Sequence, residues 1–411
     1  MTSGVGKGNW RGLGSVVGQR LWSLNGQWIC AAAQQRTGLQ DFGQPQLEPA
    51  LSMLINSLEA EAHLHPLGRL LMRVHLRDLL ETRLRLVADW EDSQHPLDSV
   101  TMERPVFIVG MPRSGSTFLH ELLAEDPANR APRVWEVMFP IAKGSCQDSE
   151  QRRICKAERC LWWFRKLAPE ADSVFPMRAW TPHECVAIHS YTFQSEEFVS
   201  TCRIPSYEKF LRASDRKGAY VWQKRFLQSL QRGRTPRRWI LKSPDHAHSL
   251  EGLLAVFPDA AIIQTHRNPF QVLRSSVELT RVLQGLYAWP DNLEQLAARE
   301  VRVLAEGTER FIRFRDEHPE LAERFIDVKY TDLISDPLLT VAEIYERLEM
   351  PLTAEARGRM QRLASQRSRY QGIQRGSFSK GLDRTVVDEA RRFDLYCSRF
   401  GVTAQSAELS R

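Results

Sequence analysis

The chain has 411 residues, of which 42% are hydrophobic and 26% charged, and its net charge is +6. This composition predicts a sizeable folded core and excludes a globally disordered chain. A membrane span is not expected, because no apolar run reaches about 18 residues. The mild positive charge suits anionic ligands, although a solvated basic surface is its commoner cause. No nucleic-acid partner is expected either, because the sequence lacks a recognised module with interleaved basic and aromatic residues.

The seven cysteines are an odd number, and no two of them have the spacing Cys-x-x-Cys. We expect free thiols in a reducing compartment, with neither a disulfide frame nor a zinc site. The N-terminus is rich in glycine and lacks the compact apolar core of a secretory signal. A cytoplasmic location and the absence of a metal site are the resulting expectations.

The first hundred residues predict a helical extension. The glycine-rich start predicts an arm with one helix around Val16–Ala33. Leu47–Asp89 has leucines at helical spacing, and Pro66 divides it into two helices. These helices either cap the core or pack in a homodimer, or they form a lid that shapes an acceptor pocket. We therefore divide the chain into an extension, residues 1–100, and a main domain, residues 101–411.

A predicted phosphate-binding loop opens the main domain. Val106–Val109 is a short apolar run that predicts a buried strand. Gly110–Thr117 (GMPRSGST) follows at once, and apolar residues at helical spacing come next. The glycines let backbone N–H groups turn inward, and the helix N-terminus adds a partial positive charge. This layout is typical of a phosphate cradle.

The loop differs from the Walker A loop of nucleoside triphosphatases. Ser116 stands where G-x-x-x-x-G-K-[ST] has its lysine, and the cation lies inside the loop, at Arg113. Without that lysine, a nucleoside triphosphatase would lack its main contact with the γ-phosphate. A divergent P-loop nucleotide kinase or NTPase is the alternative interpretation, and the missing lysine argues against it.

Aromatic and basic residues mark the segments after the first helix. Asp126–Pro140 predicts a loop followed by a short strand or turn, and it carries Glu136. Cys155–Lys166 predicts a helix with a basic face and three aromatic residues. Phe175–Glu184 and Tyr191–Tyr207 are aromatic and irregular in pattern. Such segments either line a substrate pocket or roof a core.

Two further predicted strands each end in a cation. Arg238–Lys242 predicts a strand whose last residue is a lysine, and a helix starts soon after it. Ala261–Thr265 predicts a second apolar strand, and Arg267 follows its end. Ser275 lies in the helix that comes next.

Strands and helices continue to alternate toward the C-terminus. Leu293–Glu317 predicts a long amphipathic helix, and Arg324–Lys329 predicts a strand that ends at Tyr330. Asp336–Leu348 predicts a helix with an aspartate cap and an early proline. A basic loop, Ser368–Arg384, precedes the last helix. This order predicts an α/β fold, with a P-loop-like parallel sheet flanked by helices and an N-terminal helical extension.

Three strand ends in this layout carry cations. Because ligands of an open parallel sheet lie at the carboxyl ends of its strands, Arg113, Lys242 and Arg267 are expected to converge. They predict a site for a ligand with two separate anionic groups. One group would lie in the cradle, and the other would meet Arg267 and Ser275.

These motifs resemble those of the PAPS-dependent sulfotransferase family, whose donor is 3′-phosphoadenosine 5′-phosphosulfate. FIVGMPRSGST resembles the 5′-phosphosulfate loop, and THRNP with Ser275 resembles the 3′-phosphate motif. ILKSPDH and VKYTDLISDP resemble two further stretches of the family. The resemblance covers roughly Arg104–Asp336 and is nearest to the tyrosylprotein and bacterial branches, because the loop carries Arg where the cytosolic branch carries Lys.

The resemblance implies in-line transfer of a sulfuryl group from PAPS to a hydroxyl or amine, with PAP as the product and no metal. Arg113 and Lys242 would stabilise the charge on the leaving phosphate oxygen. The residues implied to bind the nucleotide are Arg113, Ser114, Gly115, Ser116, Thr117, Arg267, Ser275, Tyr330, Ser377 and Lys380. Packing in the core is the alternative role of Tyr330, and a solvated basic turn is the alternative for Ser377 and Lys380.

The acceptor hydroxyl needs a general base. By resemblance to the tyrosylprotein branch, this would be Glu136, which otherwise pairs with a neighbouring arginine. In the cytosolic branch the base is a histidine close after the lysine, but Pro244 occupies that position here. His246 is the second candidate and Glu184 a third.

The sequence leaves the acceptor open. Small-molecule, lipid and carbohydrate hydroxyls all fit the implied chemistry, and the aromatic segments and N-terminal helices are expected to shape the pocket. A protein that binds PAP without catalysing transfer is a further alternative. The presence of all three cationic elements argues against it.

Overall fold

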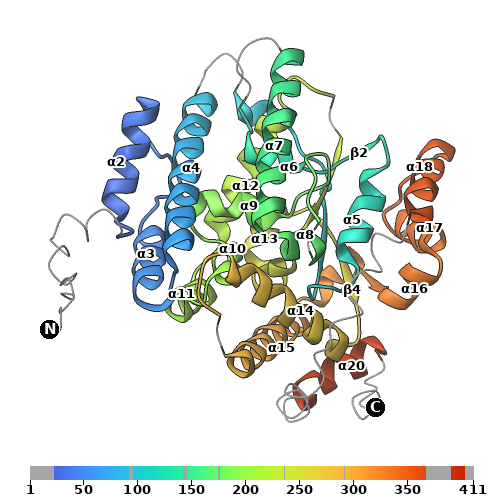
Figure 1. The fold of residues 1–411 in the computed structure, drawn as a ribbon. Helices are drawn as coiled ribbons and strands as arrows, with labels where there is room; N and C mark the ends of the chain where they lie inside the picture. The colour runs from blue at the N-terminus through green and yellow to red at the C-terminus, as the bar shows by residue number, and fades with distance from the viewer. Residues whose placement is uncertain are drawn as a thin grey trace, which may run out of the picture.

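The computed structural model of the protein describes residues 23–91, 96–141, 146–174, 176–235, 237–290, 292–366 and 390–402. Figure 1 shows the N-terminal helices on one side of the molecule and helices from the last third of the chain on the other. Ser377 and Lys380 lie outside the described residues, so their predicted role stays a prediction.

Five parallel strands form a central sheet, in the order β2-β3-β1-β4-β5. Their bounds are β1 Val106–Gly110, β2 Asn129–Arg130, β3 Arg238–Lys242, β4 Ala261–His266 and β5 Phe325–Lys329. The predicted α/β fold with a parallel sheet is confirmed. Because β1 lies between β3 and β4, the loop that leaves β1 has a strand end on each side.

Most of the other described residues form helices, which pack around this sheet. The N-terminal helices are α2 Gly26–Thr37, α3 Ala50–Glu61 and α4 Pro66–Trp90. Those before β4 are α5 Ser116–Ala124, α6 Val134–Met138, α7 Cys146–Leu167, α8 Pro169–Val174, α9 Cys185–His189, α10 Glu196–Thr201, α11 Pro205–Ala213, α12 Lys217–Gln231 and α13 Leu250–Val256. Those after β4 are α14 Pro269–Gly285, α15 Leu293–Glu317, α16 Tyr330–Ser335, α17 Pro337–Arg347, α18 Ala354–Ser365 and α20 Asp394–Phe400. Short 3₁₀ turns are η2 Leu97–Ser99, η3 Ser190–Thr192, η4 Pro244–His248, η5 Pro319–Arg324 and η7 Ala390–Phe393.

Both faces of the central strand β1 are buried, which explains why β1 is apolar throughout. Side chains alternate between the faces along β1. Phe107 and Val109 pack into a cluster that includes the N-terminal helices, whereas Val106 and Ile108 pack with residues of α5, α17 and α18. The loop after β1 is therefore held by a fully buried strand.

The N-terminal helices share one hydrophobic cluster with the sheet. Arg83 of α4 is fully buried and strengthens this attachment. Its guanidinium donates to the carbonyl oxygens of Phe42 and Tyr191, both at 2.7 Å, and lies over the ring of Trp222. The two helices predicted on either side of Pro66 are present as α3 and α4, and they cap the core. Whether residues 1–100 form a separate unit stays a prediction.

The structure differs from the sequence-based expectation in four places. The stretch Asp126–Pro140 forms the edge strand β2 and then the short helix α6. The helix expected to start at Ser243 is divided into η4 and α13. The segment Tyr191–Tyr207, read as irregular, contains η3, α10 and the start of α11. These elements are too short for a periodic pattern to reveal them. In the fourth place, the helix expected around Val16–Ala33 is present as α2 Gly26–Thr37, and the part of the expectation before residue 23 lies outside the described residues. Within the described ranges, no helix combines the length and the apolar character that a membrane span requires.

Gly110 ends β1 with a φ of +135°. A Cβ at this position would lie 2.5 Å from Oγ1 and 2.6 Å from the carbonyl oxygen of Thr265 on β4. We therefore expect Gly110→Ala to lower the free energy of unfolding by roughly 1–3 kcal/mol, because backbone strain adds to the clash. Urea denaturation measures the change.

Gly285 supplies the matched control, because a Cβ there meets no atom within 4 Å. Gly285→Ala, at the end of α14, should leave stability unchanged or raise it slightly. Equal effects of the two substitutions would contradict the close approach of β1 and β4.

Candidate active site

The loop between β1 and α5 is shaped to expose backbone N–H groups. Gly110 and Gly115 have positive φ values, and Arg113 shares this left-handed conformation with a φ of 62°. Gly115 caps α5 without a side-chain hydrogen bond, which leaves the helix N-terminus available to an anion. The buried hydroxyl of Ser114 hydrogen-bonds to Thr265 Oγ1 at 2.6 Å, so it ties the loop to β4.

Four of the predicted nucleotide-binding residues meet beside this loop. Arg113 Nε donates to Ser275 Oγ at 2.9 Å, and Arg267 donates to the carbonyl oxygen of Arg113 at 2.7 Å. The Arg267 guanidinium lies 4.0 Å from the ring centroid of Tyr330. Burial lowers the pKa of both guanidinium groups, and the charge of Arg267 lowers that of Arg113 further. A bound anion would relieve both effects.

Lys242 lies at the end of β3, with a side chain that is only 4% exposed. Its Nζ donates to Glu184 Oε1 at 2.5 Å and to Thr117 Oγ1 at 3.4 Å. Glu184 is the N-cap residue of α9 and lies in a segment far from β3 in sequence. The structure thus brings a lysine, a carboxylate and the predicted phosphate-binding loop together.

The other two candidate bases do not line the cavity at this site. Glu136 caps α6, where it accepts a hydrogen bond from the backbone N–H of Arg133 at 2.9 Å and another from Arg130 at 2.7 Å. His246 is fully buried, and its Nδ1 lies 2.9 Å from the hydroxyl of Tyr220. Burial lowers the pKa of His246 to about 3. Of the three candidates, only Glu184 borders the cavity.

A cavity of about 1430 Å³ connects these groups. The loop after β1, Lys242 and Arg267 line one part of it, and apolar side chains line another part. The apolar wall comes mainly from α6, α7, α14 and α15, including Val137, Phe164, Leu283 and Leu304. Helix α4 also borders the cavity, so the N-terminal extension both caps the core and shapes this pocket.

A histidine–carboxylate pair that the sequence did not reveal also lines the cavity. His75 Nε2 of α4 lies 2.8 Å from Glu197 Oε1 of α10, and Glu197 is also hydrogen-bonded to Ser190. Burial alone would lower the pKa of His75, but the pairing with Glu197 outweighs burial and raises it. No local pattern signals a pair whose members lie so far apart in sequence.

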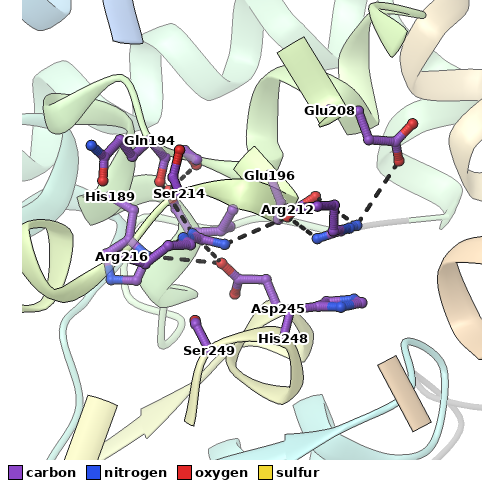
Figure 2. A network of polar contacts seen from close by, with 12 residues as sticks. His189, Gln194, Glu196, Glu208, Arg212, Ser214, Arg216, Asp245, His248 and Ser249 are labelled. Carbon is purple, nitrogen blue, oxygen red and sulfur yellow. Dashed lines mark hydrogen bonds and ion pairs between the residues drawn. The ribbon is translucent and has the colours of Figure 1, made fainter. Parts of the chain in front are cut away.

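A buried ion-pair network supports the turn that follows Lys242 (Figure 2). Arg216 is 3% exposed and donates to Asp245 Oδ2 at 3.0 Å and to the carbonyl oxygen of Gln194 at 3.1 Å. Glu196 accepts from Arg212 at 2.5 Å and lies 3.5 Å from Arg216. The network links η4 to α10, α11 and the start of α12, and thereby holds the end of β3.

The described residues contain no group of three or more His, Cys, Asp and Glu side chains that could hold a metal ion.

Comparisons with known proteins point to one family. A model of the sulfotransferase family matches residues 105–354. Two curated relatives, from Mycobacterium bovis and Mycobacterium tuberculosis, are both named omega-hydroxy-beta-dihydromenaquinone-9 sulfotransferase Stf3. Each is 27% identical over 273 residues, and the match covers 61% of this chain and 64% of the relative. The match thus spans less than two thirds of the length of these relatives.

Two crystal structures resemble the whole fold. Sulfotransferase STF9 from Mycobacterium avium has a TM-score of 0.76 and 28% identity, over 92% of this chain and 97% of its own. Sulfotransferase STF1 from Mycobacterium tuberculosis H37Rv has a TM-score of 0.70 and 27% identity, over 86% of this chain and 100% of its own.

We expect Arg216→Met to lower the free energy of unfolding by roughly 3–5 kcal/mol, because it leaves Asp245 as an uncompensated buried charge. Burial alone would raise the pKa of Asp245, but contacts with His189 and Arg216 hold it well below its ordinary value. The stabilisation from Asp245 is therefore complete above its unfolded pKa of about 4 and is lost as pH falls through the lower folded value. Urea titrations at several pH values measure both effects.

Arg359→Met is the control, because Arg359 pairs with Glu355 on the surface at 2.8 Å. It should cost less than about 1 kcal/mol. A similarly small loss in Arg216→Met would contradict a supporting role for the buried network.

Proposed function

Because the chain belongs to the sulfotransferase family, we propose that it transfers a sulfuryl group from PAPS to a hydroxyl or amine of a small, lipid-like acceptor. The convergence of Arg113, Arg267 and Lys242 around the loop after β1 carries this proposal. Membership of the family favours this proposal over a nucleotide kinase or an NTPase. A protein that binds PAP without catalysing transfer is the alternative that the transfer assay below tests.

The residues at the carboxyl edge of the sheet fit the two anionic ends of PAPS. The loop approaches β4 at Gly110 and Tyr330 at Gly115 so closely that a side chain at either position would clash. The N–H groups of Gly115–Thr117 at the N-terminus of α5 would hold the 5′-phosphosulfate. Arg267 and Ser275 would hold the 3′-phosphate, and Tyr330 would lie nearby. PAPS supplies the activated sulfuryl group.

Lys242 and Arg113 would stabilise the charge that develops on the leaving phosphate oxygen, each by a charge-assisted hydrogen bond. Lys242 pairs with Glu184 in this structure. An anionic donor would compete with Glu184 for Lys242 and would release the carboxylate toward the acceptor. The same lysine would thus link donor binding to the availability of the base.

We assign the general base to Glu184, in place of Glu136. Both carboxylate oxygens of Glu136 already accept hydrogen bonds, and Glu136 lies apart from the cavity lining. Glu184 borders the cavity beside the predicted leaving-group lysine. In this role Glu184 accepts the proton of the acceptor hydroxyl as the oxygen attacks sulfur.

The size and lining of the cavity support an apolar acceptor. Its volume of about 1430 Å³ exceeds the range of roughly 300–1,000 Å³ that is usual for small-ligand pockets. There is thus room for an elongated acceptor beside the nucleotide. The two curated relatives are named for an omega-hydroxy menaquinone derivative, which is also a lipid with a hydroxyl group. The cytoplasmic location and the homodimer stay predictions from the sequence.

We expect Arg267→Ala to weaken PAP binding by roughly 1–3 kcal/mol, the scale of a lost charged hydrogen bond. Isothermal titration calorimetry with PAP measures the change, and a titration with ATP and Mg²⁺ checks donor selectivity. Arg302→Ala, on the exposed face of α15, serves as the control. An unchanged affinity in Arg267→Ala would remove this residue from the nucleotide site, and a preference for ATP would contradict PAPS as the donor.

We expect Glu184→Gln to lower the transfer rate by about 10²–10⁴-fold, because the acceptor proton loses its base. PAP affinity should be kept or increased, since the substitution frees Lys242. Radiolabelled PAPS and a panel of long-chain alcohols provide the rate. Glu136→Gln is the matched comparison and should keep its transfer rate while losing stability, since it weakens the pair with Arg130. If Glu136→Gln lost the transfer activity and Glu184→Gln kept it, the general base would be Glu136.

A further inference from the structure

One end of α7 exposes large apolar side chains to solvent. Trp162, Trp163 and Leu167 are 46%, 57% and 61% exposed, respectively. They lie within six residues of one another, near the end of the helix. Exposed apolar residues are common singly, but a group of this size on one helix end marks a site of interaction.

Basic side chains continue the same face of α7 toward its start. Four exposed basic residues and one exposed tryptophan follow one another at alternating intervals of four and three residues: Arg152, Lys156, Arg159, Trp163 and Lys166. This spacing places them on one side of a helix. The face is therefore cationic along its length and aromatic at one end.

Several acidic side chains near this face have basic partners: Glu158 pairs with Arg165 of α7 itself, and the exposed Glu170 of α8 pairs with Arg281. Glu158 is half-buried and accepts a hydrogen bond from the backbone N–H of Ala179 at 2.7 Å. Glu150 pairs with Arg234, and Asp172 of α8 pairs with Arg178. Their charges are thus partly compensated, and the positive potential of the exposed face is retained.

The opposite face of α7 forms part of the cavity wall. Ile154, Ala157 and Leu161 are buried against Val134 and Trp135 of α6. Leu161 and Phe164 also line the cavity. Figure 1 shows α7 beside α6 and continuing into α8. Arg152 and Lys156, at the other end of the basic face, also border the cavity. Helix α7 therefore lies between the apolar part of the cavity and the exposed surface formed by its last turns.

We propose that the exposed face of α7 docks on the surface of an anionic lipid bilayer. Trp162 and Trp163 would lie at the level of the headgroups, where the amphipathic indole ring is favoured, with Leu167 below them. Arg159 and Lys166 would contact the lipid phosphates. The inference rests on the proposed function in that a lipid-like acceptor would pass from the bilayer to the cavity beside α7.

Other occupants fit this face less well. A second copy of the chain placing the same face against it would bring like charges together, which opposes a two-fold contact. A nucleic acid would use the basic residues, but it has no apolar phase for Leu167. A bilayer offers both the anionic surface and the apolar interior.

The test is sedimentation with vesicles, in the absence of PAPS and acceptor. Vesicles of equal parts phosphatidylcholine and phosphatidylglycerol should bind the wild-type protein, whereas phosphatidylcholine alone should bind it weakly. Trp162→Ser with Trp163→Ser should lower the partition coefficient roughly tenfold or more, because two large apolar side chains are lost. Arg159→Glu with Lys166→Glu should lower it at least about fivefold for each charge, and high salt should abolish the difference between the vesicles.

Two substitutions away from this face are the controls. Trp289→Ser removes an indole that is 65% exposed between α14 and α15, and Arg357→Glu reverses an exposed charge on α18. Both should bind anionic vesicles like the wild type. Circular dichroism checks that all variants remain folded.

Three outcomes would overturn the inference. The first is that the wild-type protein does not bind anionic vesicles. The second is that the α7 variants bind them as well as the controls do. The third is that the wild type does not bind vesicles but forms a dimer or an oligonucleotide complex that the α7 substitutions abolish. Vesicle binding without transfer would count against the proposed function alone. Transfer to a water-soluble alcohol without vesicle binding would count against docking alone.

Discussion

Three parallel strands lie side by side in the middle of the sheet, and each delivers a cation to the same edge. Val106 of β1 is paired with Ile240 of β3 on one side and with Ala261 of β4 on the other. This register leaves the phosphate-binding loop between Lys242 and Arg267. The positions of the residues proposed to bind the donor therefore follow from strand order, and a change of order would separate them even with every loop intact.

Gathering cations in a buried place has an electrostatic cost, and the structure limits it in several ways. Lys242 is paired with Glu184, and Arg267 is stacked on Tyr330 and bonded to a carbonyl oxygen. Arg113 remains close to Arg267, and its pKa is lowered. An anionic ligand would remove this residual repulsion. Relief of the repulsion between the two guanidinium groups would therefore contribute to the affinity for the ligand.

The elements that the sequence predicted well are those with local signals. The buried strands, the glycine-bounded loop, Lys242, Arg267 and Ser275 each follow from composition, spacing or motif, and parallel topology then brings them together. The N-terminal helices were also predicted from leucine spacing. Their contribution to the cavity was not decided, because it depends on the direction in which α4 crosses the core.

Local sequence signals could not rank the candidate bases. Glu136 and Glu184 both follow aromatic or irregular segments, and nothing local ranks their distances from Lys242. No capping-box signal marked Glu136, because Arg133, not a serine or threonine, precedes α6; the hydrogen bond from the backbone N–H of Arg133 to Glu136 appears only in the structure. The His75–Glu197 pair had no signal at all, because its two residues belong to helices that meet only in the folded protein.

Helix α4 lies outside the stretch that matches the family model, although it forms one wall of the cavity. The proposed donor site thus comes from the matched stretch alone, whereas the wall around the proposed acceptor pocket comes from that stretch and from α4 outside it. If the proposed function holds, substitutions in α4 could change the acceptor without altering the residues proposed to bind the donor. Two proteins with closely similar matched regions need not share an acceptor, and family membership alone is a poor guide to the metabolite that each one modifies.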